Sequence, residues 1–451
     1  MEIKLSQYNL EVPVGKTIYL YNTLTETSLK LTLEQWTCIK QVVESVKKDD
    51  PEKNKWSEVI AFLLENGFIL PQRVDEIVLA VEKYNRVISD ISRLSLVIAP
   101  SLKCNMNCYY CYEGEKPDLS LGVEDIEALL VFIQSRLRKN GKLSITWFGG
   151  EPLLSKDFIL KVSQKLQDIC GEMNILYAFR MVSNGYYLDA STALELSQHG
   201  ISSVQVTLDG SRHEHNLVRK STLDGKNAEN SFDVILNNIL AASEFLNIII
   251  RINVSLKNID SMPLLIKQLK EAGLAGLAER KSQLYFYPVF NYKPADQSAN
   301  YLPKQEIHFS MEQFAYLECK LINLALEQGF EILAPVFFKA GYLGCYALVD
   351  NGFVIDFRGD IKKCDHELGA SGTAFSNLNN LDEFTSDRNL HKWRKRRPES
   401  YNSCRACIFL PICYGHCPHS NLTLPDREPL CPNYKYNWHD LFPIFLEKRH
   451  G

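Results

Sequence analysis

The sequence predicts an α/β protein whose centre is a curved, parallel sheet. Between residues 94 and 310, strand-like apolar segments alternate six times with helix-like segments, a pattern typical of parallel sheets covered by helices. Six repeats in this span are too few for a closed eight-fold barrel, which takes roughly 250 residues. We therefore expect a partial (β/α)6 barrel with its reactive groups at the carboxyl ends of the strands.

Residues 1–72 precede the barrel and follow a different pattern. Three short strands and then two helices are expected, at Tyr8–Val12, Thr17–Tyr21, Ser28–Leu31, Leu33–Val46 and Trp56–Asn66. Gly67 follows the second helix, at a position where a left-handed residue commonly ends a helix. The pattern predicts a small winged-helix-like α+β domain, and the polar segment 73–93 reads as a helical linker.

The six barrel strands are expected in the segments LSLVIAP, SITWFGG, AFRMVSNG, SVQVTLDG, IIIRINVSL and LYFYPVF. A bridging region over residues 311–341 begins with a helix at Met311–Glu327. From residue 342 to residue 451 the chain loses periodicity and becomes rich in Cys, Pro, Gly and Asn. Small folds of this composition commonly depend on bound metal, so this segment is predicted to be a separate C-terminal domain.

Composition excludes several classes of protein. The net charge of −4 over 451 residues argues against bulk binding to nucleic acid or to a membrane surface. No apolar run reaches the roughly 18 residues of a membrane span, and MEIKLSQYNLEV lacks the apolar core of a signal peptide, so we expect a cytoplasmic protein. Its thirteen cysteines then indicate metal binding or catalysis, because the cytosol keeps thiols reduced. Cys38, Cys170 and Cys319 lie in helix-like apolar patterns and are expected to be core residues.

The first cysteine group directly follows the first barrel strand. Cys104, Cys108 and Cys111 are spaced C-x3-C-x2-C in the segment SLKCNMNCYYCYEG. Three thiolates in so short a loop can bind an iron–sulfur cube, which normally takes four cysteines, so one iron would remain open to another ligand. The alternative is a zinc site, which generally requires four protein ligands.

At these residues the sequence resembles the radical S-adenosylmethionine (SAM) superfamily. The resemblance implies a [4Fe-4S] cluster whose open iron is chelated by SAM. It also implies reductive cleavage of SAM to methionine and a 5′-deoxyadenosyl radical, which abstracts a hydrogen atom from the substrate.

The ends of the next three strands carry residues that look like the superfamily's SAM contacts. Gly149 and Gly150 would let backbone approach the amino group of SAM, and Glu151 would accept from its ammonium. Ser183 would contact SAM and Arg219 would bind its carboxylate. The full expected set is Tyr112, Gly149, Gly150, Glu151, Pro152, Ser183, Asn184 and Arg219. Asn216 stands where many relatives have Asp, which puts a carboxylate role there in doubt.

The C-terminal cysteines resemble the SPASM module of peptide-modifying radical SAM enzymes. The pattern implies a distal auxiliary [4Fe-4S] cluster and a proximal one, held by Cys404, Cys407, Cys413 and Cys431 and by Cys345, Cys364 and Cys417, respectively. The proximal set lacks a fourth protein ligand, which a Tyr, Cys319 or a substrate thiolate could supply. Zinc is the alternative for the stretch from Cys404 to Cys417. The segment VIDFRGDIKKC predicts a hairpin with Gly359 in its turn.

The resemblance favours a maturase of ribosomally made peptides that closes a thioether or carbon–carbon crosslink. The N-terminal domain resembles the peptide-recognition element of such enzymes, where a leader peptide could add a strand to the sheet edge; a packing or dimerisation domain is the alternative. A flavodoxin or ferredoxin is the expected electron donor. A second hypothesis is sulfatase maturation to formylglycine, in which Asp365 matches that family's general base. A third is a noncatalytic iron–sulfur electron-transfer protein.

Overall fold

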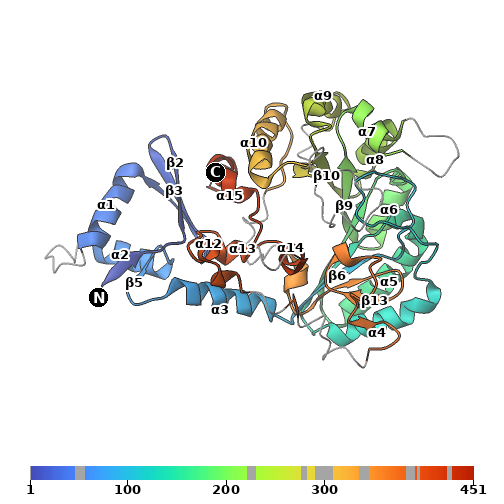
Figure 1. Ribbon diagram of the computed structural model, residues 1–451, viewed down its shortest axis with the longest axis horizontal. Helices are drawn as coiled ribbons and strands as arrows, with labels where there is room; N and C mark the ends of the chain where they lie inside the picture. Colours follow the sequence, from blue (N-terminus) through green and yellow to red (C-terminus); the bar gives the residue numbers. More distant parts are fainter. Residues whose placement is uncertain are drawn as a thin grey trace. The chain divides into compact units, whose positions relative to one another are not determined.

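The protein is described here from a computed structural model (Figure 1), which covers residues 2–45, 56–220, 230–275, 282–289, 308–334, 345–381, 392–393, 397–423 and 429–450. The chain divides into two compact units. One contains residues 1–89, 334–345 and 395–451, and the other contains residues 90–333 and 346–394. We call them the terminal unit and the barrel unit.

The barrel unit confirms the predicted α/β class. Its sheet has the order β11-β10-β9-β8-β7-β6-β12-β13-β14, and the six strands β6 to β11 pair in parallel in the order of the sequence. They are β6 (Arg93–Ile98), β7 (Lys142–Trp147), β8 (Leu176–Ser183), β9 (Ile201–Leu208), β10 (Asn247–Val254) and β11 (Gln283–Pro288). All six predicted strand segments are therefore present.

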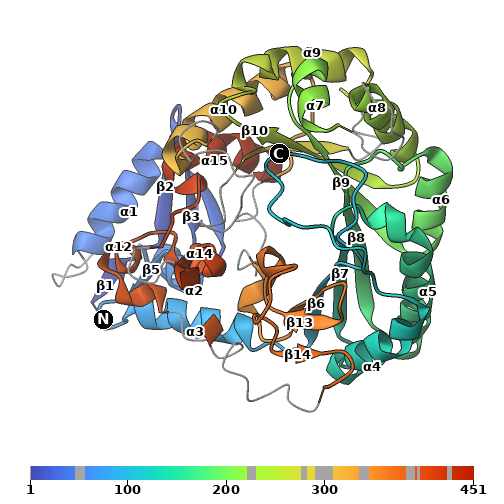
Figure 2. The same ribbon diagram turned by 45° about the vertical axis from the view of Figure 1, so that its right-hand side comes forward.

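Helices cover the outer side of this curved sheet, as Figure 2 shows. They are α4 (Ile126–Arg136), α5 (Lys156–Glu172), α6 (Ala190–Gln198), α7 (Arg212–Val218), α8 (Ser231–Ala242), α9 (Met262–Glu271) and α10 (Met311–Glu327). Side chains alternate along each strand, so Leu143, Ile145 and Trp147 of β7 are fully buried while the residues between them are partly exposed. This alternation directs one row of side chains to the apolar layer and leaves the other row on the opposite face of the sheet.

A hairpin from the C-terminal region extends the barrel sheet. Strand β12 (Gly352–Ile355) pairs in parallel with β6, and β13 (Asp360–Lys362) returns antiparallel to β12 before β14 (Ser376–Asn377). Gly359 has a φ of 75° in the turn, as the predicted hairpin requires. The pairing of β12 with β6 was not predicted, and it makes Cys364 and Asp365 part of the barrel unit.

The terminal unit is built around a three-stranded antiparallel sheet, in the order β2 (Asn9–Val14), β3 (Thr17–Asn22) and β4 (Ser28–Thr32). The sequence analysis missed strand β1 (Ile3–Leu5), which pairs with β5 (Ile69–Pro71). The N-terminal helices are α1 (Leu33–Ser45), α2 (Ser57–Glu65) and α3 (Glu76–Ile88). The predicted strands and helices of residues 1–72 are thus present, with bounds shifted by a few residues, and the segment 73–93 contains the helix α3.

Both faces of this small sheet are buried. On one face Ile18 and Leu20 pack with Trp36, Leu63 and other residues of the N-terminal helices. On the other face Leu10, Val12, Tyr19 and Tyr21 pack with Phe409, Ile412, Tyr434 and Phe442. The second set belongs to the C-terminal helices, which are α12 (Asn402–Arg405), α13 (Leu410–Cys413), α14 (Pro418–Thr423) and α15 (Tyr434–His450). The two ends of the chain therefore share one core.

The domain boundaries expected from the sequence stay predictions, because division by compactness is a different criterion. In the part of the chain that the structure describes, no helix combines the length and apolarity needed to cross a bilayer.

Candidate active site

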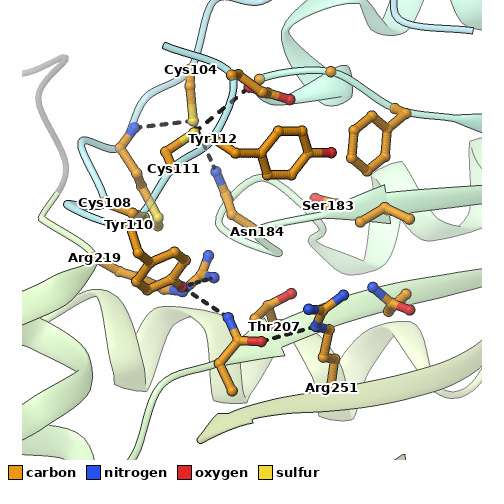
Figure 3. Close-up of a pocket in the computed structure, with 18 of the residues that line it drawn as sticks. Cys104, Cys108, Tyr110, Cys111, Tyr112, Ser183, Asn184, Thr207, Arg219 and Arg251 are labelled. Carbon is orange, nitrogen blue, oxygen red and sulfur yellow. Dashed lines mark hydrogen bonds between the residues drawn. The ribbon is translucent and has the colours of Figure 1, made fainter. Parts of the chain in front are cut away.

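A cavity of about 330 Å³ lies in the barrel unit. Most of the residues predicted to bind the cluster and SAM line it (Figure 3). These residues are Cys104, Cys108, Cys111, Tyr112, Gly149, Gly150, Ser183, Asn184 and Arg219, and Asp365 lines the same cavity. The ends of several strands and the hairpin thus contribute to one wall, as expected for a parallel sheet.

The three cysteines of the first group lie on the cysteine loop, which we define as residues 101–114. The backbone N–H of Met106 donates to Cys104 Sγ at 3.4 Å, and that of Cys111 donates to the carbonyl of Cys108 at 3.1 Å. Burial raises the pKa of Cys108 to about 11 and that of Cys111 to about 12. Buried thiols of this kind become thiolates when a positively charged centre compensates the lost hydration.

The glycines after β7 bring that strand end against the cysteine loop. A Cβ atom on Gly149 would lie 2.2 Å from the carbonyl oxygen of Ser101, and one on Gly150 would lie 2.3 Å from the carbonyl oxygens of Leu102 and Lys103. Gly150 N–H donates to Ser101 O at 3.2 Å. The lack of side chains is therefore required for contact between backbones, a physical reason that the sequence analysis did not consider.

Glu151 lies behind the cavity wall rather than in it. Its fully buried carboxylate accepts from Ser183 Oγ at 2.9 Å, from Asn184 N–H at 2.8 Å and from Leu153 N–H at 3.0 Å. Burial raises its pKa. Neither Glu151 nor Pro152 is among the residues that line the cavity. The carboxylate therefore fixes the end of β8, and its predicted contact with the SAM ammonium stays a prediction.

Arg219 reaches the cavity from the end of α7 and is held by two partners. Its guanidinium forms a buried ion pair with Asp209 and donates from Nη2 to Tyr110 Oη at 2.9 Å. Tyr110 Oη donates to Asp209 at 2.7 Å and accepts from Asn253 Nδ2 at 3.0 Å. The ion pair with Asp209 keeps the pKa of Arg219 well above its ordinary value, against the effect of burial. Arg219 is thus a fixed cation in the cavity wall.

Tyr112 and Asp365 meet across two distant parts of the sequence. Tyr112 Oη donates to Asp365 Oδ2 at 3.2 Å, and Tyr346 Oη donates to Asp365 Oδ1 at 2.6 Å. The ring of His366 lies against that of Tyr112, with centroids 4.4 Å apart. The cysteine loop and the hairpin therefore touch through a carboxylate held by two phenols.

Strands β9 to β11, at one end of the sheet, add a polar surface that was not predicted from the sequence. Arg251 donates from Nε to Asn253 Oδ1 at 2.9 Å, and its guanidinium carbon lies 4.1 Å from the centroid of the Tyr287 ring. All three residues line the cavity, as do Gln205 and Thr207. Their signal was present, since polar residues alternate with buried apolar ones along IIIRINV and LYFYP. Tyr110, between two predicted cluster ligands, was also overlooked.

A second cavity, in the terminal unit, is lined by several cysteines. Cys404, Cys407, Cys413 and Cys431 all line it, and we call this group the four-cysteine site. The backbone N–H of Cys407 donates to the carbonyl of Cys404 at 3.0 Å, in the turn that follows α12. The backbone N–H of Cys413 donates to the carbonyl of Phe409 at 2.8 Å, within α13. Tyr414 then ends α13 in the left-handed conformation, with a φ of 42°. The four ligands predicted for the distal cluster thus face one space.

The predicted proximal set is divided between the two units. Cys345 and Cys417 belong to the terminal unit and Cys364 to the barrel unit, so this ligand set and its missing fourth member stay predictions. Cys170 and Cys319 are buried and Cys38 is partly buried; all three lie in helices, as expected of core residues.

The donor sets at the two cavities fit iron–sulfur clusters. Each provides three or four soft thiol ligands in one cavity, which suits iron more than cations that prefer hard ligands. Among the described residues, no three His, Cys, Asp or Glu side chains converge on a point that would hold a single metal ion. A cube distributes its cysteines over separate irons, so its ligands need not meet at one point.

Comparison with known proteins identifies the domain around the first cavity. Residues 98–269 match the family model described as the radical SAM superfamily. The chain is 23% identical over 390 residues to the "Radical SAM cyclopropyl synthase TigE" of Paramaledivibacter caminithermalis, covering 81% of this chain and 77% of that protein. It is 37% identical over 131 residues to a "Probable GTP 3',8-cyclase" of Archaeoglobus fulgidus, but that match spans 38% of the relative's length.

Two solved structures share the fold. One is anSMEcpe with bound AdoMet, with a TM-score of 0.59 and 18% identity, covering 79% of this chain and 97% of that chain. The other is Streptococcus suis SuiB bound to the precursor peptide SuiA, with a TM-score of 0.53 and 17% identity, covering 96% of this chain and 98% of that chain. Together with the cysteine triad and the polar strand ends of the first cavity, the family match shows that residues 98–269 form a radical SAM domain.

Proposed function

We propose that this enzyme modifies a ribosomally made precursor peptide, by abstracting a hydrogen atom and closing an intramolecular thioether or carbon–carbon crosslink. The observation that carries the proposal is that the cavity of the radical SAM domain is also lined by Asp365 and His366 of the C-terminal hairpin. A peptide-binding fold supports it, because the SuiB structure with its bound precursor peptide covers 96% of this chain.

The radical SAM family implies SAM and one [4Fe-4S] cluster. Cys104, Cys108 and Cys111 would hold that cluster, and SAM bound beside it would supply the 5′-deoxyadenosyl radical for hydrogen abstraction. Arg219, fixed by Asp209 and Tyr110, offers a preorganised partner for the carboxylate of SAM. Glu151 acts on this site indirectly, because it orients Ser183 and the backbone of Asn184.

The remaining parts of the proposal concern auxiliary clusters and partners. Two auxiliary [4Fe-4S] clusters are proposed, a distal one at the four-cysteine site and a proximal one at Cys345, Cys364 and Cys417. Strand β4 lies at an edge of the N-terminal sheet and is the proposed docking strand for the leader peptide. A flavodoxin or ferredoxin is the proposed electron donor in the cytoplasm.

Co-expression tests this function directly. The enzyme is produced with a short precursor encoded beside its gene, and the peptide is analysed by mass spectrometry. We expect the loss of two hydrogens per crosslink and, in vitro, conversion of SAM to 5′-deoxyadenosine by the reduced enzyme. The Cys108→Ala variant should do neither. An unchanged peptide with every neighbouring precursor, in the presence of active SAM cleavage, would contradict the proposal.

A second candidate is oxidation of a Cys or Ser residue to formylglycine, the reaction of sulfatase maturation. The position of Asp365 in the cavity wall favours it, because that reaction needs a base near the substrate. The same mass spectra separate the two reactions, since formylglycine carries an aldehyde that reacts with hydrazides and a crosslink does not. The third hypothesis, a noncatalytic electron carrier, is not retained because the radical SAM domain makes the chain an enzyme.

A further inference from the structure

Among the described residues that line the four-cysteine site, Lys435 is the one with a charged side chain. The lining of the site in the described part of the chain consists of the four cysteines, small or apolar residues, Ser403 and Lys435. Lys435 lies in the first turn of α15, four residues after Cys431. Its Nζ donates to Cys431 Sγ at 3.1 Å. A lysine therefore contacts a predicted cluster ligand directly.

The neighbouring residue makes a similar contact. The hydroxyl of Tyr434 hydrogen-bonds to the thiol of Cys413. Two consecutive residues of α15 therefore each form a hydrogen bond with one of the four sulfurs. Behind them lies the apolar cluster that includes Phe409, Ile412 and Phe442. This apolar layer covers one side of the site, and Lys435 itself is partly exposed. Its effect on the site therefore depends on the direct contact of Nζ with Cys431 Sγ.

Reduction of an iron–sulfur cluster adds one negative charge to it. A cation and hydrogen-bond donors at the ligand sulfurs stabilise the reduced form more than the oxidised form, and so raise the reduction potential. Lysine side chains carry a positive charge at neutral pH, and Nζ of Lys435 lies 3.1 Å from Cys431 Sγ. Lys435 therefore places a positive charge directly at one ligand sulfur.

We infer that Lys435 is a positioning residue that raises the reduction potential of the cluster held at the four-cysteine site. The inference rests on the proposed distal cluster. A raised potential suits this cluster to accept an electron, and a crosslink that removes two hydrogens from the peptide needs such an acceptor for its second electron. Tyr434 assists through Cys413.

The test is a redox titration followed by electron paramagnetic resonance. To remove the signal of the SAM-binding cluster, the full-length protein carries Cys104→Ala, Cys108→Ala and Cys111→Ala and is reconstituted anaerobically with iron and sulfide. The distal signal is assigned by its loss in a further Cys404→Ala, Cys407→Ala variant. Iron content is measured for every sample.

Lys435→Met should shift the midpoint potential of the distal signal to a more negative value with unchanged iron content. Lys435→Arg should keep the midpoint potential close to that of the wild type, because it keeps the charge. Lys435→Gln should shift the potential to a more negative value, as Lys435→Met does. Tyr434→Phe should give a smaller shift in the same direction. Lys267→Met, which removes one charge from the exposed face of α9 in the barrel unit, is the matched control and should leave the potential unchanged.

Each other outcome decides the matter. An unchanged potential in both Lys435→Met and Lys435→Gln overturns the role of Lys435 while leaving the distal cluster in place. Loss of iron in both variants shows that Lys435 serves assembly and also overturns its role in setting the potential. Absence of any iron that depends on Cys404 and Cys407 overturns the distal cluster itself, and the inference with it.

Discussion

Gly150 shows how a residue without a side chain can determine the position of a metal-binding loop. We expect Gly150→Ala to push Leu102 and Lys103 away, because the new Cβ would lie 2.3 Å from their carbonyl oxygens. Overpacking of this kind costs roughly 1–3 kcal/mol. The predicted result is a lower iron content at the cysteine loop and SAM binding weakened about tenfold or more, measured by iron assay and equilibrium dialysis.

Gly171→Ala is the matched control for this substitution. Gly171 lies in the last turn of α5, and a Cβ there would have no atom within 4 Å. Alanine is favoured over glycine in a helix by about 0.5–1 kcal/mol, so this variant should keep its iron and unfold at a slightly higher temperature. Equal iron contents in the two variants would show that the close approach at Gly150 does not position the loop.

His215 predicts how the stability of the barrel unit depends on pH. Complete burial lowers its pKa to about 3, while the unfolded chain binds a proton near pH 6.5. Above pH 6.5 the imidazole is neutral in both states, so its burial has no cost. As the pH falls from 6.5 towards 3, only the unfolded chain binds the proton, and the free energy of unfolding decreases. By pH 5.5 the loss should be about 1 kcal/mol.

Urea unfolding of the wild type and of His215→Gln at pH 7.5 and pH 5.5 measures this effect. Glutamine does not titrate and can still accept from Asp209 N–H, which now donates to His215 Nδ1 at 3.4 Å. The variant should lose less stability on acidification than the wild type. Parallel losses in the two proteins would mean that His215 is protonated in the folded state.

Most of the residues predicted to bind the cluster and SAM do line the first cavity, because the cysteine spacing and the strand ends are local patterns. Glu151 could not be distinguished from a wall residue, because its three hydrogen bonds come from segments that only the fold brings together. Tyr110 was missed for a related reason, because its partners Asp209, Arg219 and Asn253 follow 99 to 143 residues later. Arg251 contacts Asn253 on its own strand β10, and only the fold places both residues in the cavity wall.

At the scale of the elements, the hairpin β12–β13 depends on a buried ion pair. Lys362 and Asp356 are both fully buried, with Nζ and Oδ2 2.9 Å apart. Lys362 also donates to the carbonyls of Glu367 and Ala370. We expect Lys362→Met to leave the buried Asp356 carboxylate with only the more distant Arg358, whose Nη2 lies 4.0 Å away, and to destabilise the barrel unit by roughly 3–5 kcal/mol.

Thermal unfolding of the anaerobic protein measures this change, with Lys156→Met as the control. Lys156 forms a 2.6 Å pair with Glu195, but both side chains are partly exposed, so its loss should cost less than about 1 kcal/mol. Because the hairpin carries Cys364 and Asp365, Lys362→Met should also reduce peptide modification. If the two variants unfold at the same temperature, the buried pair contributes nothing to the stability of the hairpin.

The elements themselves were predicted well where periodicity is strong. The six barrel strands and the helix Met311–Glu327 are present, because each carries a long, regular apolar pattern. Strand β1 was missed since three residues show no periodicity, and its identity depends on pairing with β5, more than sixty residues later. The parallel pairing of β12 with β6 is equally non-local.

At the scale of the whole molecule, the N-terminal sheet supports the four-cysteine site. Leu10 is fully buried against the C-terminal residues Phe409 and Phe442, whereas Leu20 is fully buried on the opposite face with Trp36. Leu10→Ala should cost about 2–5 kcal/mol and also lower iron retention at the four-cysteine site.

Leu20→Ala is the matched comparison, because it removes the same atoms from the other face. It should destabilise the N-terminal domain by a similar amount and leave iron retention closer to that of the wild type. Iron released to a chelator over time measures the difference. Equal release from both variants would indicate that the sheet stabilises the terminal unit as a whole, without a specific effect on the site.

The sequence could not predict this shared core. The alternation of Leu10, Val12, Tyr19 and Tyr21 shows that one face of the sheet is apolar, but their partners follow almost four hundred residues later. The cluster ligands could be predicted because cysteine spacing is a local pattern. The shared core could not be predicted, because it depends on contacts between the N-terminal and C-terminal parts of the chain.

The shared core also has a consequence for biosynthesis. While the ribosome is still making the protein, the apolar face of β2 and β3 lacks its partners until the segment from Phe409 to Phe442 has been made. Exposed apolar surface of this kind binds chaperones or other nascent chains. The folded four-cysteine site therefore requires that both the N-terminal sheet and the C-terminal helices have been made, and slowed translation should leave the apolar face of the sheet exposed for longer and more prone to aggregation.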